Sequence, residues 1–122
     1  MNESAEITIK ELSDMAVGSY LLADVRDEIS FGYGAIPGAV SMPNIVELAK
    51  EGTLAKDKKY ILYCMKGVAS ADAAIELREL DYDAVSLAGG YSAWLMASFG
   101  GDDKQEEIEK SLRKGRFHKA LF

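Results

Sequence analysis

The chain has 122 residues, of which 48% are hydrophobic and 28% are charged. This length suits one domain around one core, and the balance of apolar and charged residues excludes a wholly disordered chain. The formal net charge of −6 argues against general nucleic-acid binding, because the chain has no overall positive field that would attract phosphates.

Cysteine content and the N-terminal sequence predict the compartment. The single cysteine cannot form an internal disulfide, which favours a reducing environment. Residues 1–15 carry acidic side chains and no apolar run of signal-peptide length. No segment approaches the roughly 18 apolar residues that span a bilayer. We therefore expect a cytoplasmic protein without a membrane span.

The sequence of the N-terminal third of the chain predicts short secondary-structure elements, followed by a long loop. Residues 7–15 indicate an extended piece and then a helical turn introduced by Thr8. Residues 20–25 form an apolar run of strand length that ends in charged residues. Residues 31–43 contain three glycines, both prolines and no helical period, which predicts a loop with a short strand near Val40.

The middle of the chain predicts a helix followed by a buried strand. Residues 44–52 favour a helix that Asn44 can cap and Gly52 can end. Residues 58–64 are short and apolar on both faces, as is typical of a strand inside a parallel sheet.

Residues 70–81 give the strongest helix signal, with Ser70 as the expected N-cap and Asp72 near the positive end of the helix dipole. A third strand is predicted over residues 83–90 and a short helix over residues 91–99. Strands therefore alternate with helices, which indicates an α/β sandwich around a mainly parallel sheet.

The composition changes from Gly100 onward. Residues 110–122 contain five basic residues and no acidic one, whereas all 20 acidic residues precede them. We therefore divide the chain into a domain over residues 1–100 and a charged helical appendage over residues 101–122. This appendage is expected to pack apolar side chains on the domain; an acidic protein partner and an acidic lipid surface are the alternatives.

The single cysteine, Cys64, lies where the strand over residues 58–64 ends. In a parallel sheet, ligands collect at the carboxyl ends of the strands. The following residues 65–69 can turn successive N–H groups inward to form an anion-binding nest, and Gly67 permits the backbone angles that this requires. Such surroundings favour a reactive thiolate. The alternative is an inert core cysteine, because free cysteine is among the most buried residue types.

Four stretches follow one another along the chain: "LLADVRD", "GAIPGAVSMP", "YILYCMKGVAS" and "VSLAGGYSAW". In this order they resemble the rhodanese homology domain, a family of sulfurtransferases. They resemble the family's early Asp-Val-Arg strand, its Gly-His-Ile-Pro-Gly-Ala loop, its active-site strand and loop, and its closing Leu-x-Gly-Gly-x-x-Ala-Trp segment. The resemblance covers roughly residues 6–98, about three quarters of the chain.

The resemblance implies a rhodanese-like three-layer sandwich with helices on both faces of the sheet. It also implies that Cys64 accepts a sulfane sulfur as a persulfide and passes it to a thiol or another nucleophile. No metal and no organic cofactor are expected. The substrate would be bound through main-chain amides of the loop residues Met65, Lys66, Gly67, Val68, Ala69 and Ser70.

The expected partners are a small-molecule or protein sulfur donor and a thiol acceptor, with no nucleic acid. A protein partner could also bind through the basic C-terminal tail. The rival hypothesis is a non-enzymatic binding or sulfur-carrier module that keeps the fold.

Two positions depart from the family pattern. Ala35 stands where the family usually has histidine, and Ala69 stands where many members have arginine. A guanidinium at position 69 would be a natural partner for the sulfonate end of thiosulfate, whereas Lys66 is a flexible point charge. We therefore expect thiosulfate to be a poor donor. Phosphatase activity is disfavoured for a related reason, since the Cys-x5-Arg arginine of that class would fall on Ser70.

Other residues have structural interpretations. Asp24 and Arg26 are expected to form a structural brace near the site, because charges close to a core must be paired. Gly89-Gly90 is expected to form a tight turn, and Trp94 to pack in the core or at its rim. His118, the only histidine, is expected to be solvated rather than catalytic.

Overall fold

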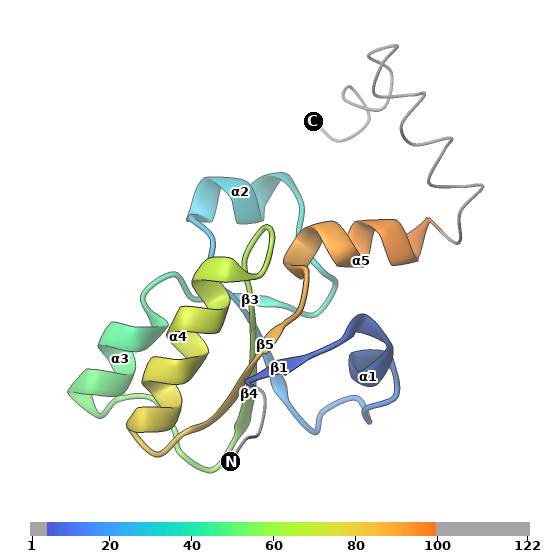
Figure 1. Ribbon diagram of the computed structural model, residues 1–122. Coiled ribbons are helices and arrows are strands. Elements are labelled where there is room, and N and C mark those ends of the chain that lie inside the picture. Colours follow the sequence, from blue (N-terminus) through green and yellow to red (C-terminus); the bar gives the residue numbers. More distant parts are fainter. Residues whose placement is uncertain (1–4, 100–122) are drawn as a thin grey trace.

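The computed structural model describes residues 5–99 (Figure 1). Over this range the chain forms five strands and five helices that alternate along the sequence. In chain order they are β1 (Glu6–Ile7), α1 (Ile9–Ser13), β2 (Leu21–Asp24), α2 (Glu28–Tyr33), β3 (Val40–Ser41), α3 (Ile45–Glu51), β4 (Lys59–Tyr63), α4 (Val68–Glu79), β5 (Asp83–Leu87) and α5 (Gly90–Ser98).

The strands form one sheet in the order β1-β5-β4-β2-β3, and all of its pairings are parallel. The register is continuous across the centre of the sheet: Leu62 of β4 lies opposite Ala23 of β2 on one side and Ser86 of β5 on the other. The last four residues of β4 are buried in succession, as expected for a central strand that is covered on both faces.

Helices cover both faces of this sheet (Figure 1). On one face, α3 and α4 pack on a core that includes Ala23, Leu62 and Leu77. On the other face, α1 and α5 pack on a core that includes Leu12 and Ile61. Side chains alternate between the two cores along each strand because successive strand residues point to opposite faces. The predicted three-layer α/β sandwich with a parallel sheet is therefore confirmed.

Several local predictions are also confirmed. Thr8 caps α1 in a capping box, in which its side chain accepts from the Glu11 N–H and the Glu11 carboxylate accepts from the Thr8 N–H at 2.8 Å. The short strand near Val40 is β3. Helix α3 ends at Gly52 in a left-handed conformation, although Asn44 at its start makes no capping hydrogen bond through its side chain.

Two local predictions are wrong. Helix α2 was not predicted, and its end overlaps the segment that we expected to be a loop. This helix begins with a capping bond from the Ser30 N–H to the Asp27 carboxylate. None of its residues is buried, so the sequence has no apolar stripe that would indicate a helix here. Ser70 is not the N-cap of α4, because this helix already begins at Val68 after Gly67.

The predicted appendage over residues 101–122 and the solvated His118 lie outside the described residues. The division into a domain over residues 1–100 and an appendage therefore stays a prediction. Between residues 5 and 99, none of the helices is long and apolar enough to cross a membrane.

Candidate active site

Cys64 follows directly after β4, at the carboxyl edge of the sheet, and its sulfur is enclosed by the loop that leads into α4. The residue is 9% exposed. Its Sγ accepts hydrogen bonds from two backbone N–H groups, that of Gly67 at 3.2 Å and that of Ser70 at 3.3 Å. The loop thus curls around the sulfur and directs backbone donors at it, as an anion-binding nest does.

Gly67 makes this curl possible. Its φ of 96° lies in the left-handed region, and a Cβ at this position would lie 2.9 Å from the backbone N of Gly89 and 3.3 Å from the carbonyl O of Leu87. A side chain at position 67 would therefore be strained and would also collide with a neighbouring backbone segment. The glycine lets the loop pack directly against the end of β5.

A second group of donors comes from two buried serines. Ser70 and Ser86 are both fully buried, and their hydroxyl oxygens are 2.7 Å apart. Ser70 Oγ also lies 3.4 Å from Cys64 Sγ, where it accepts from the thiol in the neutral form. When the cysteine ionises, the Ser70 hydroxyl can turn to donate to the thiolate and accept from Ser86. The three residues therefore form a short hydrogen-bonded chain that satisfies either state of the sulfur.

These contacts lower the pKa of the Cys64 thiol below its ordinary value. Burial alone would raise the pKa, because it penalises the charged thiolate. Hydrogen bonds from the Ser70 hydroxyl and from the N–H groups of Ser70, Gly67 and Lys66 favour the thiolate and outweigh this effect. The site therefore stabilises the nucleophilic form of the sulfur.

The predicted substrate-binding loop divides into an inner and an outer set. Gly67 and Ser70 are buried against the sulfur, as described above. Met65, Lys66, Val68 and Ala69 are exposed. All six main-chain amides were expected to form the anion-binding nest. The N–H groups within hydrogen-bond distance of Sγ are those of the inner residues Gly67 and Ser70, and of the outer residues the N–H of Lys66 also favours the thiolate. That any of the six binds substrate remains a prediction.

The start of α5 holds this loop through hydrogen bonds to its backbone carbonyls, a role that the sequence analysis did not predict. The N–H of Tyr91 donates to the Cys64 carbonyl at 2.8 Å, and the N–H of Ser92 donates to the Met65 carbonyl at 3.0 Å. Gly90 has a φ of 58°, and a Cβ on it would collide with the Cys64 carbonyl. The Gly89-Gly90 turn therefore also provides the close approach that holds the cysteine loop.

Asp24 and Arg26 form an ion pair at the end of β2, beside the cysteine loop. Arg26 donates to both Asp24 carboxylate oxygens, with the shortest contact, from Nη2 to Oδ2, at 2.7 Å. Its Nη2 also donates to the Gly34 carbonyl at 2.6 Å, and its guanidinium lies 4.4 Å from the ring centre of Tyr91. The Asp24 side chain is fully buried and that of Arg26 is 8% exposed, so their charges balance each other inside the fold.

Aromatic rings extend this cluster. Tyr91 stacks on Trp94 with ring centres 5.8 Å apart, and Trp94 packs at the edge of the core as predicted. The Tyr63 hydroxyl accepts from the Ile36 N–H at 3.0 Å, and burial raises the pKa of that hydroxyl. Ala35, where the resemblance implies a histidine, is half-buried next to this contact.

A cavity of about 560 Å³ lies at the opposite edge of the sheet. Its walls include Tyr20 and Leu21 at the start of β2 and Lys59 at the start of β4. Cys64 follows the other end of β4, so this cavity belongs to a different region from the nucleophile.

The chain matches known proteins over the region that contains these features. The sequence profile of the rhodanese-like domain matches residues 8–97. The thiosulfate sulfurtransferase GlpE of Shewanella oneidensis is 33% identical over 96 residues, which cover 77% of this chain and 95% of GlpE. The probable adenylyltransferase/sulfurtransferase MoeZ of Mycobacterium tuberculosis is 36% identical over 97 residues, but this chain spans only 25% of MoeZ.

A solved structure agrees with these matches. The rhodanese-related protein of Thermoplasma volcanium superposes with a TM-score of 0.64 at 28% identity, over 74% of this chain and 89% of that one. Fold, profile and relatives of similar length all point to one assignment. The chain belongs to the rhodanese-like domain family.

Proposed function

We propose that the protein is a sulfurtransferase in which Cys64 accepts a sulfane sulfur and passes it to a thiol or another nucleophile. The observation that carries this proposal is the set of groups around Cys64 Sγ: the N–H groups of Gly67 and Ser70 donate to it, and the Ser70 hydroxyl, which accepts from the neutral thiol, can turn to donate once the thiol ionises. An inert core cysteine has no need of donors aimed at its sulfur. Relatives that are named sulfurtransferases support the same activity.

The first step is attack by the Cys64 thiolate on the outer sulfur of a donor. A new S–S bond forms at Cys64, and the donor's bond to that sulfur breaks with its electron pair. With thiosulfate as donor, the products are the Cys64 persulfide and sulfite. In the second step, a nucleophile such as cyanide or a thiolate attacks the outer sulfur and releases the Cys64 thiolate.

The cradle suits both forms of the sulfur. Attack requires a thiolate, and the hydrogen bonds that lower the pKa of the Cys64 thiol favour that form. The persulfide carries its charge on a terminal sulfur, which backbone N–H groups stabilise without a change in their own protonation. Residues of the loop from Met65 to Ser70 would supply these donors, and neither step requires a metal or an organic cofactor.

The donor preference follows from position 69. Ala69 is exposed at the outer side of the loop and offers no charge, and Lys66 is the cation within this loop. A fixed guanidinium that could bind two sulfonate oxygens is therefore missing from the loop. We propose that thiosulfate is a poor donor for this chain and that a persulfide serves better, although GlpE is named a thiosulfate sulfurtransferase.

The second candidate is a binding or sulfur-carrier module without turnover. The missing loop arginine favours it, because a weak site for the donor can still hold sulfur. A protein donor or acceptor would suit either candidate, and the basic C-terminal tail is a further proposed contact for a protein. Sulfur transfer in the cytoplasm is likewise part of the proposal.

Intact mass spectrometry tests the proposed function. The protein is incubated with thiosulfate, polysulfide or an organic persulfide, and then with cyanide. Wild type should gain one sulfur and lose it to cyanide as thiocyanate. The matched control is Cys64→Ser, which removes the only thiol and should gain none. If folded wild type gains no sulfur from any of the donors, the proposed function is wrong.

A stable persulfide that cyanide does not discharge would favour the carrier module over the enzyme. Turnover with donor and cyanide both in excess decides between them, because an enzyme forms many equivalents of thiocyanate per protein and a carrier forms one at most.

A further inference from the structure

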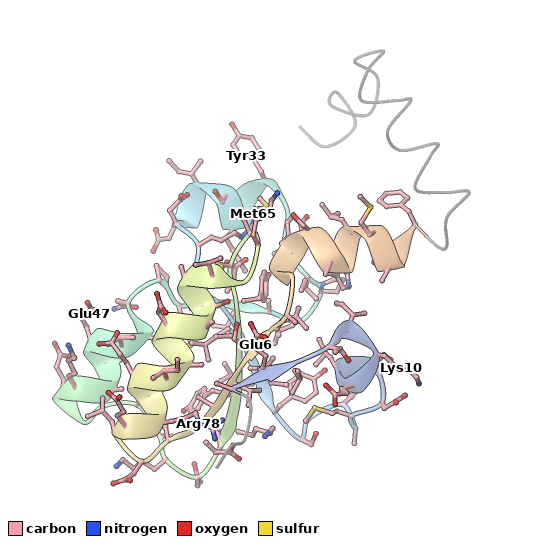
Figure 2. The ribbon with its side chains drawn as sticks, in the orientation of Figure 1. Glu6, Lys10, Tyr33, Glu47, Met65 and Arg78 are labelled. Atoms are coloured by element: carbon pink, nitrogen blue, oxygen red, sulfur yellow. The ribbon has the colours of Figure 1, made fainter. Side chains whose placement is uncertain are left out.

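An apolar pocket of about 310 Å³ lies beside the cysteine loop. Its walls include Tyr33 and Gly34 at the end of α2, Met65 in the loop, Leu95 in α5, and the side chains of Arg26 and Tyr91. Figure 2 shows the labelled Tyr33 and Met65 at the same end of the molecule, near α2. A volume of this size holds a small organic group, at the low end of the range for small-ligand pockets.

The pocket is fixed to the residue that carries the nucleophile. Met65 follows Cys64 directly in the chain, and the Tyr91 N–H donates to the Cys64 carbonyl at 2.8 Å. Two walls of the pocket are thus bonded to the backbone of the cysteine loop. A ligand in the pocket would therefore lie against the loop that carries Cys64, although Cys64 itself is not part of the pocket wall.

The charge in the pocket wall is already balanced. Arg26 directs its Nε and Nη2 at Asp24 and the Gly34 carbonyl, and the ring of Tyr91 covers its guanidinium. The remaining walls are mainly hydrocarbon and aromatic ring. The pocket therefore favours an apolar group, whereas the donors at Cys64 favour an anionic sulfur.

We propose that this pocket binds the apolar organic group of a small sulfur donor and that Met65 and Tyr33 determine this specificity. The inference rests on the proposed function and names its substrate class, an organic persulfide with an alkyl or aryl group. The Cys64 thiolate attacks the outer sulfur of R–S–SH, the new S–S bond forms at Cys64, and R–S⁻ leaves with the electron pair. The proton stays on the transferred sulfur.

This arrangement compensates for the missing guanidinium at position 69. A donor that gains little binding energy from charge can gain it from apolar contact, since burial of hydrocarbon surface is favourable. Met65 is 43% exposed and Tyr33 is 62% exposed, so contact with a bound group would cover apolar surface that is otherwise in water.

Two stable probes separate apolar contact from sulfur chemistry. Benzenethiosulfonate and methanethiosulfonate carry the same anionic sulfane group and differ only in the phenyl or methyl substituent. Their dissociation constants are measured on Cys64→Ala, which cannot react, from the chemical shifts of backbone amides. The phenyl compound should bind about tenfold more tightly, a difference that corresponds to about 1.4 kcal/mol.

Variants in the Cys64→Ala background then locate the contact. Tyr33→Ser and Met65→Ser should each reduce the phenyl preference from about tenfold to about threefold or less, because each removes part of the pocket wall. Ile29→Ser is the matched control, because Ile29 also lies on α2 and is 74% exposed but does not line the pocket. It should leave the preference unchanged.

The results distinguish this inference from the proposed function. Equal binding of the two probes, or a phenyl preference that survives both pocket variants, overturns the pocket. If the two probes bind equally and a persulfide-bearing protein loads wild type rapidly, the apolar surface is assigned to a protein partner instead. If the preference holds on Cys64→Ala but no donor loads wild type, the pocket stands and the proposed function fails.

Discussion

Two clusters lie at the ends of the neighbouring strands β4 and β2, and they use polar groups in opposite ways. In the Cys64 cradle, formed by Cys64, Gly67, Ser70 and Ser86, neutral N–H and O–H groups surround a sulfur that can become charged. In the Asp24–Arg26 cluster, two full charges are paired inside the fold. The comparison teaches that the charged groups here stabilise the structure, whereas the neutral donors favour reactivity.

The largest expected effect is the loss of stability when the ion pair between Asp24 and Arg26 is removed. Asp24→Asn should lower the free energy of unfolding by about 3–5 kcal/mol, because it leaves Arg26 without its buried counter-charge. The matched control is Asp83→Asn, which removes an ion pair with Lys59 at 3.3 Å in which the aspartate is 62% exposed. That control should cost about 1 kcal/mol or less. Denaturant unfolding measures both, and similar costs would contradict the assigned role of Asp24.

A change in the Cys64 cradle should lower the stability less than Asp24→Asn does, but it should lower the reactivity of Cys64 more. Gly67→Ala should lower the free energy of unfolding by about 1–3 kcal/mol, because alanine is strained at a φ of 96°. Its Cβ would also press on Gly89, so sulfur loading should fall by about tenfold or more.

Gly52→Ala is the control for Gly67→Ala. Gly52 has a φ of 79°, and a Cβ on it would have no neighbour within 4 Å. This variant should lose stability but retain its loading rate by mass spectrometry. If both variants load at the wild-type rate, the cradle geometry has no part in the reaction.

Adding a charge to the cradle sharpens the comparison. Ala69→Arg should raise the rate of loading from thiosulfate by about ten- to a hundredfold, since a charge-assisted hydrogen bond contributes about 1.5–3 kcal/mol. Ala69→Lys should help less, because an ammonium does not bind two oxygens in a fixed plane. The rates are measured by mass spectrometry of quenched reactions. If wild type is loaded rapidly from thiosulfate and Ala69→Arg does not change that rate, the proposed donor preference is wrong.

The smallest expected effect concerns the buried hydroxyl pair. Ser86→Ala should reduce the loading rate by about twofold, because Ser86 polarises the Ser70 hydroxyl without touching the sulfur, and such cooperativity strengthens each hydrogen bond by about 10–30%. Ser41→Ala is the matched control, since the Ser41 hydroxyl is buried without a hydrogen-bond partner in the described part of the chain. It should leave the rate unchanged. An equal loss in both variants would remove Ser86 from the cradle.

Much of the fold could be predicted because the strands and α4 carry strong local patterns. The apolar run before Cys64 indicates a strand that is buried on both faces, and Thr8 indicates the start of a helical turn. Helix α2 could not be predicted from periodicity, because it buries none of its residues. The order of the strands also required tertiary contacts that the sequence does not display.

The candidate site was only partly predictable for a similar reason. The position of Cys64 before a glycine and a helix indicated a nest of backbone donors. Ser70 was interpreted as a helix cap because serine favours that position, whereas tertiary packing directs its hydroxyl to Cys64 and to Ser86 on β5. The fit of Gly90 against the cysteine loop likewise depends on residues distant in sequence, and a pair of glycines alone indicated only a turn.

The most direct measurement is the rate of alkylation of Cys64 by iodoacetamide as a function of pH, in native and in denatured protein. The rate follows the thiolate, so its midpoint reports the pKa of the thiol. Because hydrogen bonds to the thiolate outweigh burial, the native pKa should lie below that of the denatured chain, and Ser70→Ala should raise it. A native pKa at or above the denatured one would show an inert buried cysteine and contradict the account.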